Sequence, residues 1–351
     1  MSPIGKYMSM TGLYALSHFV VDFSCAFLIF SELNGSLQWL LCLLLYNFFA
    51  FAMQMPLGLM ADKMRMTRTL AVLGCMIIAA SPLIAAFPLL FSSIAGLGNA
   101  LFHIGAGRDV LIGRDNSYSA LGFFVSPGAA GIFLGTLAGK ADAIPAVAVS
   151  GILIAFAAVI FFFVPALWDE NRMVIPVQTG PIFGKGEAGK MLVFMLLSLF
   201  LVVCLRSYVG MTLSFPWKVT GNNALYLVIA VVCGKAVGGI LADSFGPLKT
   251  SFASLFLCAI LFLFYREPFC GVLAVFLFNM TMPITLGGVS NLLKSSPGFA
   301  FGVLTFGLFF GLIPVLLGLE NALSIPYGFT AACIASALLM YYGFRGPDHA
   351  D

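Results

Sequence analysis

Two titratable side chains lie four residues apart inside an apolar segment near the N-terminus. His18 and Asp22 fall within residues 9–30, which are otherwise mostly apolar. Side chains at this spacing share one face of a helix, so the imidazole and the carboxylate would be neighbours. Imidazole changes charge near neutral pH. The pair therefore indicates a proton relay; the alternative is a hydrogen bond that only fixes the packing of this helix.

Two cations lie within other apolar segments. Arg206 falls within residues 190–213 and Lys235 within residues 222–244. A charge at the centre of a bilayer costs about 2.5–3.5 kcal/mol, so each must line an aqueous cavity or pair with an acid. Asp22 is the one deep acid and can neutralise only one of them. The surplus positive charge predicts a substrate with an anionic group; for Lys235 the alternative is a side chain that extends to the lipid headgroups.

A further histidine and arginine lie in the apolar segment 88–112. His103 falls near its centre and is either a second residue of the central site or an ordinary hydrogen-bonded core histidine. Arg108 lies nearer the expected inner face. It has two interpretations, a cavity residue or the partner of Asp62 at a cytoplasmic gate.

Two acids end apolar segments at the expected cytoplasmic face. Carboxylates such as Asp62 and Asp243 can accept hydrogen bonds from the N-terminus of a neighbouring helix and from a nearby arginine. This position predicts a gating role rather than contact with the substrate. Among uncharged polar residues in mid-segment, Asn279 would bind either the substrate or another helix.

The composition requires a membrane protein. Of the 351 residues, 61% are hydrophobic and 9% are charged, whereas soluble domains have about 45–50% and about 25%. This excludes a soluble enzyme, a nucleic-acid-binding protein and a disordered chain. Apolar segments near the ~20 residues that a bilayer requires predict an all-α polytopic fold with 12 transmembrane helices. These segments are 9–30, 36–60, 68–86, 88–112, 117–139, 143–166, 190–213, 222–244, 247–265, 268–293, 297–318 and 324–344.

One long polar segment divides the chain. Residues 168–189 predict a cytoplasmic linker between an N-terminal six-helix bundle, 1–167, and a C-terminal six-helix bundle, 190–351. Most of the 17 Lys and Arg fall on the side that holds both termini. The positive-inside rule places that side in the cytoplasm and predicts a multi-pass protein of the inner or plasma membrane.

The two bundles carry matching motifs. Residues 58–62 read G-L-M-A-D and residues 239–243 read G-I-L-A-D, at an offset of 181. Gly122 and Gly302 match at an offset of 180. These matches predict a duplicated six-helix unit, and two such repeats are a known transporter architecture with the site between the halves.

Several motifs recur along the chain in a pattern typical of one family. They are G-x-x-A-D at both positions, His18-x-x-x-Asp22, Gly96-x-Gly98-x-Ala100-x-Phe102-His103, Arg206 followed by Phe215-Pro216, and Pro297-Gly298-x-x-x-Gly302. With these motifs the chain resembles the major facilitator superfamily and, within it, the fosmidomycin-resistance-like branch. The resemblance implies a proton-coupled antiporter that exports drugs of the phosphonate class, with Asp62 and Asp243 holding the halves in an outward-open state.

Other chemistry lacks support in the sequence. No nucleotide-binding or hydrolase motif is present, so we expect neither an enzyme nor a cofactor. The eight Cys lie in apolar runs without C-x-x-C pairs, so no metal site is expected. The expected partners are a small-molecule substrate, protons and the lipid bilayer, with no nucleic acid, and the expected state is a monomer.

The sequence therefore predicts a secondary transporter that works by alternating access and is driven by a proton gradient. Asp22→Asn is expected to abolish proton-coupled movement. The alternatives are proton-coupled uptake of an organic anion or nutrient and, more remotely, a membrane-embedded sensor or enzyme without transport. The expected substrate and proton site comprises His18, Asp22, His103, Arg206, Lys235 and Asn279, and the expected gating residues are Asp62, Arg108 and Asp243.

Overall fold

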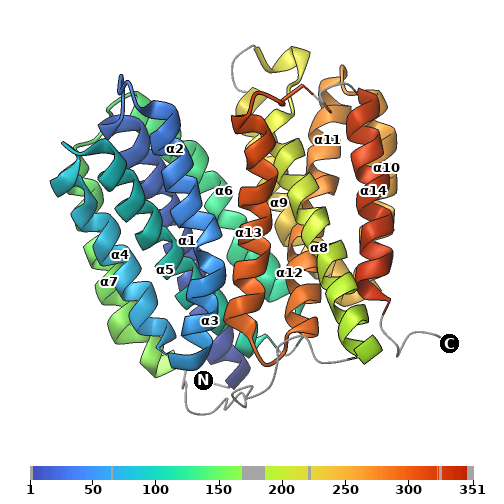
Figure 1. The fold of residues 1–351 in the computed structure, drawn as a ribbon, viewed down its shortest axis with the longest axis horizontal. Helices are drawn as coiled ribbons and strands as arrows, with labels where there is room; N and C mark the ends of the chain where they lie inside the picture. Colours follow the sequence, from blue (N-terminus) through green and yellow to red (C-terminus); the bar gives the residue numbers. More distant parts are fainter. Residues whose placement is uncertain are drawn as a thin grey trace. The chain divides into compact units, whose positions relative to one another are not determined.

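The computed structural model describes residues 3–64, 66–114, 116–167, 186–219, 223–321, 323 and 326–345. Over these ranges the chain forms helices joined by short connections, and the described part contains no strand (Figure 1). The helices up to residue 167 are α1 (Pro3–Glu32), α2 (Trp39–Asn47), α3 (Gln54–Met64), α4 (Thr67–Ala80), α5 (Pro88–Gly113), α6 (Tyr118–Lys140) and α7 (Ala146–Leu167). Those that follow are α8 (Gly186–Thr212), α9 (Asn223–Phe245), α10 (Pro247–Leu263), α11 (Pro268–Asn279), α12 (Thr281–Leu292), α13 (Pro297–Leu316) and α14 (Pro326–Phe344).

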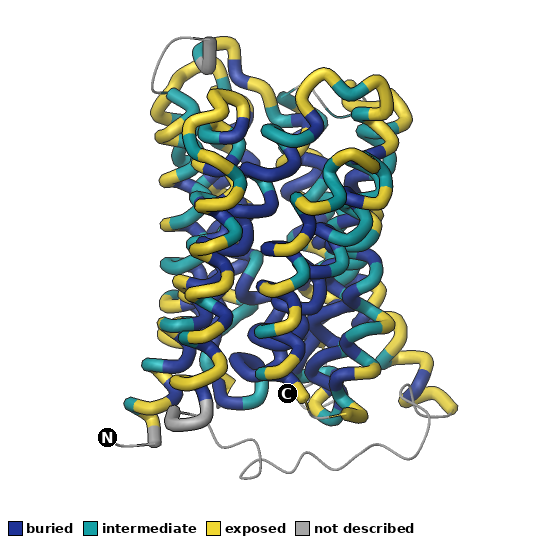
Figure 2. Tube along the Cα trace, turned by 90° about the vertical axis from the view of Figure 1, so that its left-hand side faces the viewer, coloured by how far each residue is buried: buried dark blue, intermediate teal, exposed yellow. Residues whose placement is uncertain are grey.

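The predicted all-α membrane fold is confirmed. Among the described residues, 11 helical stretches are long and apolar enough to cross a bilayer. The remaining predicted segment corresponds to α10, a shorter apolar helix of 17 residues. Figure 2 shows exposed residues along the helices, and many are large and apolar, such as Phe162 and Phe256 with exposed fractions of 70% and 69%. Such a surface suits contact with lipid rather than with water.

Two of the predicted segments are interrupted, and a proline explains each interruption. Between α2 and α3 the chain forms a π-helical turn, Phe48–Ala52, and α11 and α12 meet at Met280. Pro56 and Pro283 lie in the first turn of the second helix in each case. Proline has no N–H for the carbonyl four residues earlier and its ring clashes with that carbonyl, so regular α-helix stops there. Turns of the π type are often found at functional sites.

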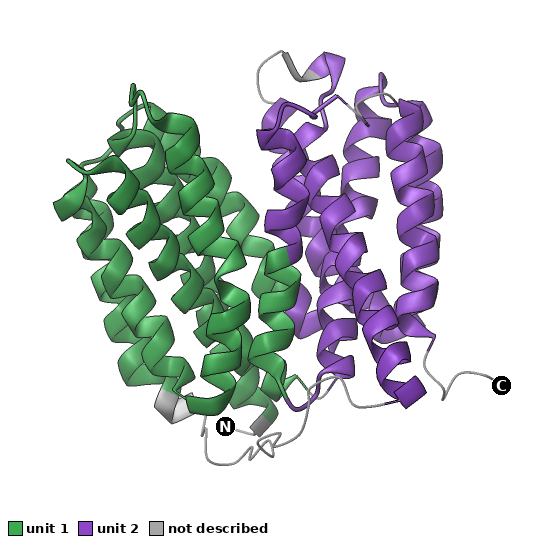
Figure 3. Cartoon of the chain, in the orientation of Figure 1, with its two compact units in different colours: residues 1–115, 123–177, 296–306 green, residues 116–122, 178–295, 307–351 purple. Residues whose placement is uncertain are grey.

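The chain forms two compact units (Figure 3). The described part of unit 1 comes from the ranges 1–115, 123–177 and 296–306, and the rest belongs to unit 2. Unit 1 therefore includes the first turns of α13, and unit 2 includes the first turn of α6. The expected linker lies outside the described residues except for 186–189, which begin α8.

The most buried helix of unit 1 is α5. In the most apolar stretch of α5, 72% of the residues are buried, compared with 28% in that of α7. A span buried to this extent is surrounded by other helices rather than by lipid. The polar side chains of α5 therefore face protein, which is the condition for a functional site at membrane depth.

Candidate functional site

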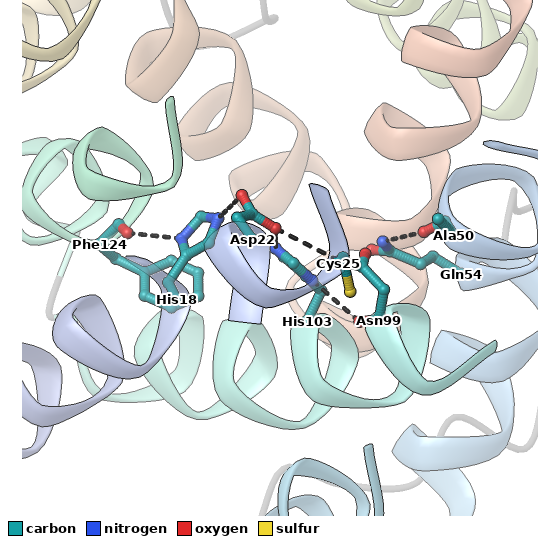
Figure 4. Close-up of polar contacts among 8 residues, drawn as sticks. All are labelled: His18, Asp22, Cys25, Ala50, Gln54, Asn99, His103 and Phe124. Atoms are coloured by element: carbon teal, nitrogen blue, oxygen red, sulfur yellow. Dashed lines mark hydrogen bonds and ion pairs between the residues drawn. The ribbon is translucent and has the colours of Figure 1, made fainter. Parts of the chain in front are cut away.

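Helices α1 and α5 bring three of the predicted residues together inside unit 1 (Figure 4). His18 Nε2 lies 3.1 Å from Asp22 Oδ2, and His103 Nε2 lies 3.6 Å from Asp22 Oδ1. The two imidazole rings meet edge to face with centroids 4.6 Å apart. All three side chains are buried. We call these three residues the His–Asp cluster.

Backbone carbonyls fix the orientation of both imidazole rings. Nδ1 of His18 lies 2.8 Å from the carbonyl oxygen of Phe124 on α6, and Nδ1 of His103 lies 2.9 Å from that of Asn99. A carbonyl oxygen only accepts hydrogen bonds, so we assign the proton of each neutral ring to Nδ1. Each Nε2 then directs a lone pair at Asp22. Three electron-rich groups face one another, and the cluster needs a proton or another cation to be stable.

Asn99 is part of this arrangement, although it is not among the residues predicted from the sequence. Its Nδ2 donates to Asp22 Oδ1 at 3.3 Å and lies 3.6 Å from Cys25 Sγ, while its Oδ1 is buried with no hydrogen-bond partner in the structure. Asn99 precedes His103 by four residues, so both face α1 from one side of α5. That spacing was the signal available in the sequence.

Gly128 of α6 leaves the space that the cluster occupies. A Cβ atom at this position would overlap His18 Nε2 and Asp22 Oδ2. These atoms are the ends of side chains, so they would move while the backbone stays in place. We expect Gly128→Ala to preserve folding but to displace the imidazole and reduce transport at least about tenfold, because misplacement by about 1 Å is costly in such sites. Transport measured beside a thermal unfolding curve tests this; wild-type transport would contradict it.

The predicted cations and amide lie in unit 2. Arg206, on α8, is buried, and its Nη1 donates to Thr285 Oγ1 of α12 at 3.1 Å. No carboxylate lies within ion-pair distance of Arg206 among the described residues. Lys235 is half-buried on α9. Asn279 donates to Val275 O of its own helix at 2.9 Å. That these three share one site with the His–Asp cluster stays a prediction.

The first predicted gating acid binds the start of α13. Within unit 1, Asp62 accepts hydrogen bonds from the backbone N–H groups of Gly298 and Phe299, each at 2.9 Å. Arg108 Nε donates to the same carboxylate at 2.8 Å. Arg108 was expected either to line the cavity or to pair with Asp62, and the structure shows the contact with Asp62. Gly58 lies so close to the Gly298 carbonyl that a Cβ atom would not fit between them.

The second gating acid makes the equivalent contact in unit 2. Asp243 accepts from the backbone N–H groups of Tyr118 and Ser119 at the start of α6, at 2.6 and 2.9 Å. The hydroxyl groups of Ser117 and Ser119 also donate to it. The two contacts follow the sequence repeat, since Asp243 corresponds to Asp62 and Tyr118 to Gly298. A carboxylate at a helix N-terminus satisfies free N–H groups and interacts favourably with the helix dipole.

These contacts predict separate local effects for the two acids. Asp62→Asn should speed hydrogen exchange at the first amides of α13 about twofold to thirtyfold, because a charge at a helix N-terminus contributes about 0.3–2 kcal/mol. Asp243→Asn should do the same at the start of α6 only. Hydrogen–deuterium exchange mass spectrometry measures both. Glu187→Gln, which breaks an exposed ion pair with Lys190, is the control. Equal changes at both helix starts in either variant would contradict the assignment.

Comparison with known proteins gives likeness in structure but not in sequence. No protein-family model matches the chain, and no curated protein matches it. The E. coli fucose:proton symporter FucP superposes with a TM-score of 0.71 at 13% identity, with 98% of each chain covered. The human organic anion transporter MFSD10 gives 0.68 at 14% identity, covering 98% of this chain and 100% of that one. A bacterial homologue of the iron transporter ferroportin, in an outward-facing state, gives 0.60 at 14% identity, with 98% of each chain covered.

At 13–14% sequence identity, these superpositions establish the fold alone. All three structures are transporters and none is an enzyme, and FucP is described as a member of the major facilitator superfamily. The narrower resemblance to the fosmidomycin-resistance-like branch stays a prediction. The chain thus has the fold of major facilitator superfamily transporters, over nearly its whole length.

Proposed function

We propose that the protein is a secondary active transporter that moves a small organic anion by alternating access, driven by a proton gradient. The observation that carries the choice of substrate is Arg206, a buried cation with no carboxylate partner among the described residues. The transporter fold supports the mode of action. We place the protein in the inner or plasma membrane with both termini in the cytoplasm, following the distribution of Lys and Arg.

The environment of Arg206 favours an anionic ligand. Thr285 provides only a neutral hydroxyl group, so the guanidinium keeps its full charge in an apolar span. Burying a charge without a partner costs several kcal/mol, and a substrate carboxylate or phosphonate would offset that cost. The planar guanidinium presents two parallel N–H donors to such groups. The solved neighbour MFSD10 is described as an organic anion transporter, which supports the same class of substrate.

The His–Asp cluster supports coupling to a cation, and we assign the proton as that cation. The buried carboxylate of Asp22 faces two imidazole nitrogens that also carry lone pairs, so the cluster attracts positive charge. FucP is described as a proton symporter. For direction we propose efflux by antiport, as the resemblance to the fosmidomycin-resistance-like branch implies. Binding of a proton from outside would neutralise Asp22, and its release inside would restore the charge.

Transport by the purified protein in proteoliposomes tests the proposal. We would add carboxylates and phosphonates, including fosmidomycin, and follow proton flux with trapped pyranine and substrate flux with radiolabel. Movement of at least one anion, with protons moving in the opposite direction, is the expected result. Protons that move with the substrate would overturn antiport, and anion flux without proton flux would overturn coupling. Transport of neutral sugars with no anion moved would overturn the substrate class.

A further inference from the structure

We propose that the His–Asp cluster is a binding site for one divalent transition-metal ion, with His18 Nε2, His103 Nε2 and the Asp22 carboxylate as ligands. Two imidazoles and a carboxylate are the donors that Zn²⁺, Fe²⁺ and related ions prefer, whereas Mg²⁺ and Ca²⁺ prefer oxygen donors. This inference goes beyond the proposed function, because it concerns equilibrium binding and holds whether or not the protein transports an anion.

The distances between the three groups fit a shared metal ion. Two ligand atoms at about 2.1 Å from a tetrahedral metal ion lie about 3.4 Å apart. His18 Nε2 lies 3.1 Å from Asp22 Oδ2 and His103 Nε2 lies 3.6 Å from Oδ1, so each imidazole is close to that value from a different oxygen of the carboxylate. With one ligand atom taken from each residue, all three fall within 4.8 Å of one another. A hydrogen bond between an imidazolium and a carboxylate would be about 2.7–2.9 Å long, and a 3.6 Å contact is too long for one.

The surroundings of the histidines match those of metal ligands. A metal-binding histidine almost always donates its other ring N–H to a carboxylate or a backbone carbonyl. With Nδ1 of His18 donating to Phe124 and Nδ1 of His103 donating to Asn99, each Nε2 faces Asp22 with a lone pair that can bind a cation. The hydrogen bonds therefore select the tautomer that a metal site requires.

Two further features favour binding of a cation by the His–Asp cluster. The cluster contains a buried carboxylate, and within the described chain its only ion-pair partners are the two histidines. Beside it, Oδ1 of Asn99 is buried without a hydrogen-bond partner, although Nδ2 of the same amide donates to Asp22. An unpaired buried oxygen is costly. It is a candidate for a further interaction with the ion or with a ligand of the ion.

The test is Zn²⁺ binding to the purified full-length protein in detergent, prepared with an affinity tag that lacks histidine. Isothermal titration calorimetry at about pH 7.5 should show one saturable Zn²⁺ site and no Mg²⁺ binding. Each of His18→Gln, Asp22→Asn and His103→Gln should weaken Zn²⁺ binding at least about 100-fold. Asn99→Ala, which alters a group beside the ligands, should weaken it about 10–100-fold.

His349→Gln is the matched control, because it removes the one histidine outside the cluster. Residue 349 lies beyond the described part of the chain. Its removal should leave Zn²⁺ affinity unchanged, and the Co²⁺-loaded protein should lack the strong near-ultraviolet band of a thiolate ligand. Size-exclusion profiles and thermal unfolding without metal establish that the variants are folded.

The results separate this inference from the proposed function. Absence of saturable Zn²⁺ binding would overturn the metal site, and so would Zn²⁺ binding that survives in all three cluster variants. Neither result would count against the proposal of anion transport. Failure of the anion transport assay together with Zn²⁺ binding that requires the cluster would support the metal site and overturn the proposed function.

Discussion

We expect Asp22→Asn to abolish substrate accumulation driven by a proton gradient and to leave substrate exchange across the membrane intact. Asparagine has nearly the shape of aspartate but carries no charge and does not bind a proton at neutral pH. The His–Asp cluster then lacks its one formal negative charge, so it no longer attracts a coupling cation. Exchange of labelled for unlabelled substrate requires no net proton movement and should continue. Proteoliposomes give both rates from one preparation, by ΔpH-driven uptake and by counterflow.

Asp109→Asn is the matched control for this prediction. Asp109 is a second fully buried aspartate, on α5, and it accepts hydrogen bonds from Tyr14 and Thr67 at 2.8 and 2.6 Å. We expect its replacement to lower stability by about 1–3 kcal/mol because one hydroxyl loses its acceptor. The number of protons moved per substrate should not change. Full accumulation by Asp22→Asn, or uncoupling by both variants, would contradict a specific role for Asp22.

The sequence predicts the elements of the fold well, because each depends on local composition. A run of about 20 apolar residues needs a helix in lipid, where backbone groups find no water to bind. The interruptions near Phe48 and Met280 were not predicted, although Pro56 and Pro283 each lie where they would end a helix. The sequence also indicates Asp62 and Asp243 as acids at the helix ends. Their partners at the start of α13 and α6 depend on packing between distant segments.

The site was predictable only where its residues share a helix. His18 and Asp22 are neighbours through the period of α1 alone. The contact of Asp22 with His103 depends on packing of α1 against α5, and the contact of His18 with Phe124 depends on α6. The sequence does not show that His103 lies beside this pair, so it did not indicate a metal site. Spacing along one helix does not provide a third ligand that comes from another helix.

Arg206→Gln is expected to weaken binding and transport of the anionic substrate by about 30-fold or more. The loss follows from removing the charged partner of a buried ion, which costs about 2–5 kcal/mol, and tenfold corresponds to about 1.4 kcal/mol. Glutamine still donates a hydrogen bond toward Thr285, so the contact between α8 and α12 is retained in part. Binding of the anion identified in the proteoliposome screen, measured by calorimetry, gives the affinity directly.

Two further variants separate charge from shape at this position. Arg206→Lys keeps the charge but loses the paired N–H donors, so it should recover only part of the affinity. Thr285→Val removes the hydroxyl group but keeps the charge of the Arg206 guanidinium. The affinity for the anion should therefore change by less than about tenfold, the order expected for one neutral hydrogen bond. If Arg206→Gln bound the anion as tightly as the wild type while Thr285→Val did not, Arg206 would be a packing residue. The anionic ligand would then have to bind at another cation, and Lys235 would be the first to replace.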